Sequence, residues 1–257
     1  ASDQTQLYVY GELIDSFHVG ARAGVERTPR DVAVEIALIE HLEDAWDKPG
    51  ADIWESRGDP GCYTYSQAMA WVGINHFVES ETMRAAAGDE LVGRMRELRK
   101  QIHQTVCDRG YSAERGHFVQ RYDGTALDAS LLLLPLVGLL PADDPRIAGT
   151  IAAVERELME GGLVRRKAAT GDGHDEGVFL ACSCWLADCM VMQGRRDEAA
   201  TMLDRVIGLG NDVGLLSEEF HVPTRQPLGN VPQALSHLGV VNTALFLSRD
   251  VVQRGAV

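Results

Sequence analysis

The spacing of the loops constrains the fold of this chain more than any other feature. Nine segments carry apolar residues at helical spacing, and the connections between them alternate between short and long. The short connections lie near residues 24–29, 81–87, 140–144 and 194, and the long ones near 47–63, 109–125, 160–177 and 209–227. In a series of antiparallel helical hairpins, alternate loops lie at the same end. All four long loops are therefore expected on one face.

The helical segments themselves indicate the architecture. The expected helices cover residues 6–23, 30–46, 64–80, 88–108, 127–140, 145–159, 178–193, 195–208 and 228–249, and no strand pattern stands out. The fifth and seventh segments are the most apolar, as the inner helices of a two-layer ring should be. The sequence predicts an all-α protein of the α/α-toroid type, forming a single domain over residues 1–257. Nine helices fall short of the twelve in a ring of six hairpins, and we expect the missing helices to precede residue 1.

The composition excludes several classes of function. A net charge of −14 disfavours nucleic acid and anionic membranes as partners. No apolar run reaches the roughly 18 residues of a membrane span. Five cysteines are an odd number for a disulfide framework, so a reducing cytoplasm is the expected location. Metal, phosphate-loop and dinucleotide motifs are absent from the sequence, so no cofactor and no metal are expected.

The long loops hold most of the chemically useful side chains. The loop at residues 52–61 places an aromatic ring, a carboxylate and a guanidinium within four positions, and its Gly and Pro residues break any helix. The candidate site residues in the long loops are Trp54, Glu55, Arg57, Arg166, Glu176, Glu218 and Glu219. Functional residues tend to lie in loops that a rigid scaffold holds, so we expect the chemistry on the face that these loops share.

Five groups of residues, taken in order, form a specific pattern. They are Asp52–Glu55, Leu127–Ser130 with its leucine run and Asp143–Arg146, Gly177–Ser183, Gly214–Glu219, and Leu228–His237. In these stretches the chain resembles the C-terminal part of the catalytic domain of glycoside hydrolase family 15, the family of glucoamylases and of bacterial or archaeal trehalases. The resemblance implies an (α/α)6 barrel in which Glu55 is the general acid and Glu218 the general base.

The resemblance also implies a substrate and a reaction. The expected activity is inverting, exo-acting hydrolysis that releases glucose from α-linked glucose oligosaccharides or from trehalose. An inverting glycosidase uses one protonated and one ionised carboxyl group, roughly 6.5–9.5 Å apart. The family's early substrate-binding Arg-Asp segment and the N-terminal β-sandwich of bacterial members have no counterpart in this chain. We therefore expect either an incomplete toroid that self-associates or one part of a longer enzyme.

Several alternatives stay open at this point. The chain is either a hydrolase or a non-catalytic carbohydrate-binding or fragment form of one, and a sugar epimerase of toroid architecture is a weaker third reading. Trp54 either stacks on a sugar face or fills an apolar gap. Arg57 either binds substrate or orients Glu55. Arg166 and Glu176 either hold sugar hydroxyls or form an ordinary ion pair, and Glu219 is grouped with the substrate-binding residues.

Overall fold

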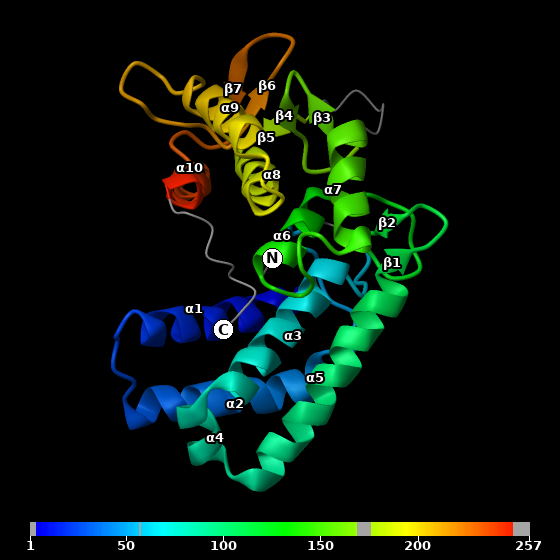
Figure 1. Ribbon diagram of the computed structural model, residues 1–257, viewed down its shortest axis with the longest axis vertical. Coiled ribbons are helices and arrows are strands. Elements are labelled where there is room, and N and C mark those ends of the chain that lie inside the picture. Colours follow the sequence, from blue (N-terminus) through cyan, green and yellow to red (C-terminus); the bar gives the residue numbers. More distant parts are fainter. Residues whose placement is uncertain (1–3, 57, 169–175, 249–257) are drawn as a thin grey trace. The chain divides into compact units, whose positions relative to one another are not determined.

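A computed structural model of the chain describes residues 4–56, 58–168 and 176–248 (Figure 1). The described part contains ten α-helices and seven strands of two or three residues. The chain divides into two compact units. The N-terminal unit is Ala1–Ser112 with Val119–Thr125, and the C-terminal unit is Ala113–Phe118 with Ala126–Val257. The all-α fold class is thus confirmed.

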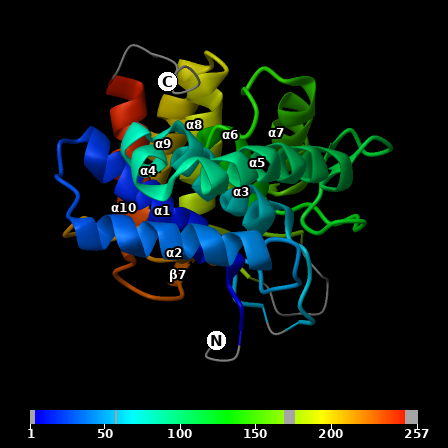
Figure 2. The same ribbon diagram turned by 90° about the horizontal axis from the view of Figure 1, so that it is seen from below.

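The N-terminal unit is built around one buried helix, α3. Its elements are α1 (Leu7–Arg22), α2 (Pro29–Ala45), α3 (Thr64–Glu79), α4 (Glu81–Ala87), α5 (Asp89–Arg109) and β1 (Tyr111–Ser112). Most residues of α3 are buried because α1, α2, α4 and α5 all pack on it. Figure 2 shows α1 and α2 side by side as a hairpin. At the start of α2, Thr28 and Asp31 form a reciprocal capping box, and Pro29 occupies the first turn.

The closest helix crossing in this unit depends on a glycine. A Cβ atom on Gly11 of α1 would lie 2.0 Å from the carbonyl oxygen of Met69 in α3. Only glycine fits there, so the two helix backbones approach closely. Ile14, one turn further along α1, is fully buried and lies beside Gly73 of α3.

The C-terminal unit has its own buried helix, α8. Its elements are β2 (His117–Phe118), the 3₁₀ helix η1 (Ala129–Leu132), α6 (Leu133–Leu136), α7 (Pro145–Glu157), β3 (Met159–Glu160), β4 (Leu163–Val164), β5 (Val178–Phe179), α8 (Leu180–Met192), α9 (Arg196–Ile207), β6 (Glu219–His221), β7 (Gln226–Leu228) and α10 (Ala234–Ser248). Nearly all of α8 is buried, with α9 and α10 packed against it (Figure 1). The buried side of α10 is made of the small residues Ser236, Gly239 and Thr243, of which Gly239 and Thr243 contact Cys184 of α8.

Three of the strands form an antiparallel sheet in the order β5-β6-β7. Val178 pairs with Phe220, and Glu219 lies between Phe179 and Leu228. The sheet joins the end of the loop at 160–177 to the loop at 209–227, so these two long loops meet, as their alternation predicts. In the N-terminal unit, the loop at 47–63 likewise pairs with residues 119–125 through an antiparallel bridge between Tyr63 and Arg121.

Four expectations about the elements are wrong. The expected helix at 127–140 is only the short pair η1 and α6, because Asp128 starts a 3₁₀ turn through its side chain and Gly138 takes a φ of 78°. Residues 81–87, expected as a loop, form α4, which Ser80 caps. The last helix begins at Ala234 rather than near residue 228, because 226–228 is a strand. The strands that the sequence did not indicate lie in or beside the long loops.

Candidate active site

The loop that carries Glu55 is fixed at both ends. Gly50 and Gly61 exchange two backbone hydrogen bonds, with N···O distances of 3.0 and 2.8 Å. The N–H of Ala51 donates to the carbonyl of Thr5 at 2.8 Å, which ties the loop to the segment before α1. The guanidinium of Arg121 packs over Gly61, where a Cβ atom would lie 2.5 Å from its Nε. The chain between these anchors is therefore a closed loop on a helical scaffold.

Asp52 shapes the tip of this loop. It is buried, and its two carboxylate oxygens accept from the backbone N–H and the hydroxyl of Ser56 at 2.8 and 2.7 Å. The N–H of Glu55 donates to the Asp52 carbonyl at 3.2 Å, and Glu55 adopts a left-handed φ of 51°. The Asp52 carboxylate thus closes a tight turn that presents the next carboxylate outward.

Glu55 is exposed at the tip of the turn. Its Oε1 accepts a hydrogen bond of 2.8 Å from the Nε2 of Gln6, the residue before α1. Trp54 is half-buried, and Arg57 lies outside the described residues. Tyr8 is buried beneath; its burial, followed by the charges of Glu12 and Glu55, raises its pKa to about 12. Tyr8 is therefore a neutral neighbour of the loop.

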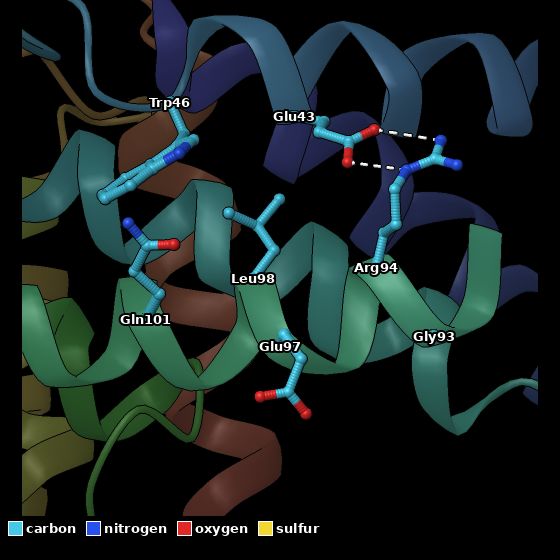
Figure 3. A pocket seen from close by; sticks show the side chains of 7 residues that line it. All are labelled: Glu43, Trp46, Gly93, Arg94, Glu97, Leu98 and Gln101. Atoms are coloured by element: carbon cyan, nitrogen blue, oxygen red, sulfur yellow. Dashed lines mark hydrogen bonds and ion pairs between the residues drawn. The ribbon is translucent and has the colours of Figure 1, made fainter. Parts of the chain in front are cut away.

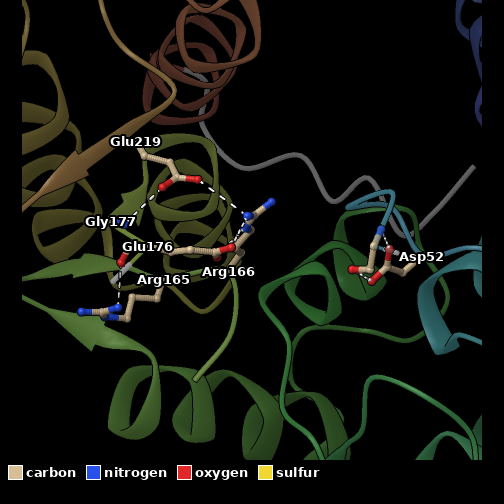
Figure 4. Close-up of polar contacts among 7 residues, drawn as sticks. Asp52, Arg165, Arg166, Glu176, Gly177 and Glu219 are labelled. Carbon is tan, nitrogen blue, oxygen red and sulfur yellow. Dashed lines mark hydrogen bonds and ion pairs between the residues drawn. The ribbon is translucent and has the colours of Figure 1, made fainter. Parts of the chain in front are cut away.

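In the C-terminal unit, Arg166 and Glu176 form a bidentate ion pair (Figure 4). The Nε and Nη2 of Arg166 donate to Oε2 and Oε1 of Glu176 at 2.9 and 2.5 Å. Burial is the largest influence on Arg166 and lowers its pKa, but the hydrogen bonds to Glu176 and the charges of Glu176 and Glu219 together raise the Arg166 pKa. The same hydrogen bonds hold the pKa of Glu176 below its usual value. The guanidinium carbon also lies 5.7 Å from the ring centre of Phe179.

Glu219 is the third member of this cluster. Its Oε1 lies 3.8 Å from Nη2 of Arg166, and its Oε2 accepts from the N–H of Gly177 at 3.1 Å (Figure 4). Burial raises the pKa of Glu219, although the charge of Arg166 acts in the opposite direction. A guanidinium shared by two carboxylates at the end of a sheet can hold a neutral polyol by charge-assisted hydrogen bonds.

Glu218 faces a different partner. Its Oε2 accepts from the backbone N–H of Asn230 at 3.1 Å and from the Asn230 Nδ2 at 3.0 Å. The N–H of Glu218 donates to the Asn230 carbonyl at 2.9 Å, and its carbonyl accepts from Leu180 at 3.2 Å. Successive side chains along an extended strand point to opposite sides. Consecutive glutamates therefore serve two separate sets of contacts.

Each unit thus assembles some of the predicted residues. The C-terminal unit brings Arg166, Glu176 and Glu219 into one cluster, with Glu218 adjacent in the chain. The N-terminal unit holds Trp54 and Glu55 in one turn. Reasoning from the sequence missed the amides Gln6 and Asn230, which are 49 and 12 residues from the glutamates they contact. The Leu228–His237 stretch contained Asn230, but nothing in it identified the partner.

Two hollows lie in the N-terminal unit, and neither is lined by the predicted site residues. The larger, about 570 Å³, lies between α2 and α5 and is lined by Glu43, Trp46, Gly93, Arg94, Glu97, Leu98 and Gln101 (Figure 3). A smaller hollow of about 120 Å³ lies beside the Glu55 loop, against Gln4, Ser56 and Tyr63. Among the described residues, no group of three or more His, Cys, Asp or Glu side chains is arranged to hold a metal ion. None of the described helices has the length and apolarity needed to span a bilayer.

Comparison with proteins of known sequence gives close relatives over most of the chain. A trehalase from Thermoplasma acidophilum is 35% identical over 99% of this chain and 44% of its own length. A trehalase from Mycobacterium tuberculosis is 34% identical over 97% of this chain and 37% of its own length. The chain therefore spans about two fifths of the length of these relatives.

Solved structures show the same fold. A glycosidase with 24% sequence identity superposes with a TM-score of 0.82, covering 95% of this chain and 67% of its own. The glucoamylase from Saccharomycopsis fibuligera, 12% identical, gives a TM-score of 0.68 over 82% of this chain and 60% of its own. Residues 1–245 also match the profile of glycosyl hydrolases family 15. With the fold, the relatives and the profile in agreement, the chain belongs to glycosyl hydrolase family 15.

Proposed function

We propose that the protein is an inverting, exo-acting α-glucoside hydrolase that releases glucose, with trehalose as its first candidate substrate. The observation that carries the proposal is the match to trehalases at 34–35% identity over nearly the whole chain. Two glutamates, each in a loop whose conformation is held by hydrogen bonds, supply the carboxyl groups that such a reaction needs. Glu55 lies in a turn shaped by Asp52, and Glu218 is held by Asn230.

In the proposed reaction the two glutamates act on opposite faces of the sugar. Glu55 in its protonated form gives its proton to the glycosidic oxygen as the bond from that oxygen to the anomeric carbon breaks. Glu218 in its ionised form takes a proton from water, and the water oxygen bonds to the anomeric carbon. Water is consumed, and the configuration at that carbon inverts.

The remaining predicted residues are proposed to hold the glucose unit. Arg166 keeps its charge because it is paired with Glu176, and both present hydrogen-bonding groups to sugar hydroxyls. Glu219 completes the cluster from the neighbouring strand. Trp54 and Arg57 are assigned to the same binding role beside Glu55. An ordinary structural ion pair is the competing explanation for Arg166 and Glu176.

The stereochemistry of the product tests the proposal. The full-length natural protein is incubated with trehalose, and proton NMR follows the glucose anomers before mutarotation. Inversion at one anomeric carbon gives equal initial amounts of β- and α-glucose, because the leaving glucose keeps its α configuration. Maltotriose should give β-glucose first. An initial product that is only α-glucose would contradict the inverting assignment.

The substrate preference is tested in the same assay. A trehalase releases glucose from trehalose at a much higher kcat/KM than from maltose or maltotriose, whereas a glucoamylase-like enzyme shows the reverse order. The second candidate function, non-catalytic carbohydrate binding, rests on the share of the relatives' length that this chain spans. It predicts sugar binding by calorimetry without glucose release. A cytoplasmic location stays a prediction from the cysteine count.

A further inference from the structure

The described hydrogen bonds to the Glu218 carboxylate are made to only one of its two oxygens. Both hydrogen bonds from Asn230, from the backbone N–H and from Nδ2, reach the same atom, Oε2. The described contacts of the Glu218 carboxylate within hydrogen-bond distance all come from Asn230 and go to this oxygen. Oε1 therefore remains available to another partner, while the two hydrogen bonds to Oε2 fix the orientation of the carboxylate.

The backbone makes this arrangement rigid. Glu218 donates to the Asn230 carbonyl at 2.9 Å and accepts from Asn230 in return, so the two residues form a closed pair beside the β6–β7 ladder. Glu218 also accepts from the N–H of Leu180 at 3.2 Å, the first residue of the buried helix α8. The general base is therefore anchored to the best-packed element of its unit.

Gly229 leaves room for the carboxylate. Its φ is +70°, in the left-handed region, and a Cβ atom there would lie 2.6 Å from Oε2 and 2.9 Å from Cβ of Glu218. Two constraints therefore coincide at one residue: the backbone conformation favours glycine, and the space above it is filled by Glu218. Gly229 and Asn230 together shape the place of one carboxylate.

We propose that Asn230 is a positioning residue for the general base, which holds Oε2 of Glu218 so that Oε1 accepts the proton from the attacking water. This inference rests on the proposed function and deepens it. A carboxylate fixed through one oxygen has fewer orientations to lose on reaching the transition state.

Two substitutions of Asn230 separate hydrogen bonding from shape. Asn230→Ala removes the Nδ2 donor, and Asn230→Asp keeps the shape but replaces the donor with a second negative group. We expect kcat to fall about 10-fold to 100-fold in Asn230→Ala, with KM changed less than about threefold. Asn230→Asp should be slower still. A merely structural role for the side-chain shape would make Asn230→Asp the milder change.

Gly229 offers a matched pair with Gly194. Gly194 connects α8 to α9 with a φ of +80° and has no atom within 4 Å of an added Cβ. Gly229→Ala and Gly194→Ala therefore share the backbone strain, but only the first displaces Glu218. Both should lower the melting temperature, whereas only Gly229→Ala should lower kcat, by about 10-fold or more. Equal loss of kcat in both variants would overturn the assignment to Gly229.

The outcomes distinguish this proposal from the proposed function. If the full-length natural protein hydrolyses an α-glucoside, Glu218→Gln is inactive and both Asn230 variants keep the natural kcat, the positioning role is wrong while the function stands. If Glu218→Gln is active, the general-base role proposed for Glu218 is wrong, and the positioning role of Asn230 is overturned with it. If the natural protein releases no glucose from any α-glucoside, the proposed function is wrong.

Discussion

At the residue scale, neighbouring glutamates differ through what faces them. Glu219 faces Arg166 and Gly177, whereas Glu218 faces Asn230. The sequence singled out both residues because they lie in a long loop, and strand alternation explains why they separate. Which amide contacts which glutamate was not predictable. An amide carries no charge pattern, and its partner is set by loop conformations that local sequence does not encode.

The proposed catalytic roles give the first prediction. Glu55→Gln and Glu218→Gln each remove one proton-transferring group and should each lower kcat of the full-length natural protein by about 10²-fold to 10⁴-fold. Glu114→Gln, at an exposed position, serves as the control and should keep the natural rate. Circular dichroism should be unchanged in all three variants. A catalytic variant with near-natural turnover and an intact spectrum loses its assigned role.

Gln6 leads to a second prediction. Its amide donates to Oε1 of Glu55, so in the proposed mechanism Oε2 carries the proton of the acid. Gln6→Ala should lower kcat about 3-fold to 30-fold, and Gln6→Glu more, because it places a second acidic group beside Glu55. Gln4→Ala is the matched control, since within the described residues the Gln4 side chain donates to the Ser56 carbonyl of the same loop and not to Glu55. Similar losses in all three variants would indicate a loop effect instead.

The charged cluster gives a third prediction, on pH and stability. Burial raises the pKa of Glu219 in the folded protein above its value in the unfolded chain, about 4.3. The stabilisation that comes from this shift is therefore complete at a pH below the unfolded pKa and is lost as the pH rises through the folded pKa. The hydrogen bonds from Arg166 lower the pKa of Glu176 in the folded protein. The stabilisation from this shift is therefore complete at a pH above the unfolded pKa of Glu176 and is lost as the pH falls through the folded pKa. Relative to the Gln variants, the natural residue should therefore lose stability with rising pH at 219 and gain it at 176.

Urea unfolding between about pH 3.5 and pH 7 measures both differences. Each comparison is made between the natural chain and one variant at the same pH, so an effect of the substitution that does not depend on pH shifts the difference by a constant and leaves its slope against pH unchanged. Opposite slopes are expected for Glu219→Gln and Glu176→Gln. Parallel slopes would show that the cluster does not shift these two carboxyl groups in opposite directions.

At the element scale, periodicity succeeded where helices are long and amphipathic. The segments expected at 30–46 and 88–108 match α2 (Pro29–Ala45) and α5 (Asp89–Arg109) within about a residue. The segment at 127–140 failed because an unbroken apolar run shows no period, so its leucines fit a helix, a strand or a compact turn equally well. Strands of two or three residues are too short for alternation to be visible. Their pairing is set by the loops that they close.

The crossing of α1 and α3 gives the fourth prediction. Gly11→Ala should destabilise the protein by about 2 kcal/mol or more, because its Cβ would lie 2.0 Å from a backbone oxygen of α3 and the helices would have to separate. Gly20→Ala, on the same helix, is the control. Its Cβ would meet Val25 only at 3.9 Å, so the gain in helix propensity should stabilise the chain by up to about 1 kcal/mol. Urea unfolding gives both values, and equal effects would mean that the crossing tolerates a side chain.

At the scale of the whole molecule, two exposed apolar faces stand out in a chain with a net charge of −14. On α10, Leu235, Leu238, Val241 and Leu245 are 56, 57, 54 and 44% exposed. They lie opposite the small residues that pack on α8. On α1, Val9, Leu13 and Val19 are exposed between 41 and 57%. Apolarity on more than one side of the first and last helices was visible in the sequence, as Leu13, Val241 and Leu245 show.

These faces give the fifth prediction. Contiguous apolar patches above a few hundred Å² are rare on soluble monomers, so residues 1–257 by themselves should self-associate despite their repulsive charge. Light scattering over a range of concentrations should give a mass that rises above the 28.1 kDa of one chain. The paired change Leu238→Glu with Leu245→Glu should lower that mass, because it places two charges within the α10 face. Val213→Glu with Leu215→Glu adds the same charge at exposed loop positions, 71 and 38% exposed, and should not. If both double variants lower the mass equally, charge alone controls association. If the unmodified chain has the mass of one chain at every concentration, the exposed faces of α1 and α10 do not drive association.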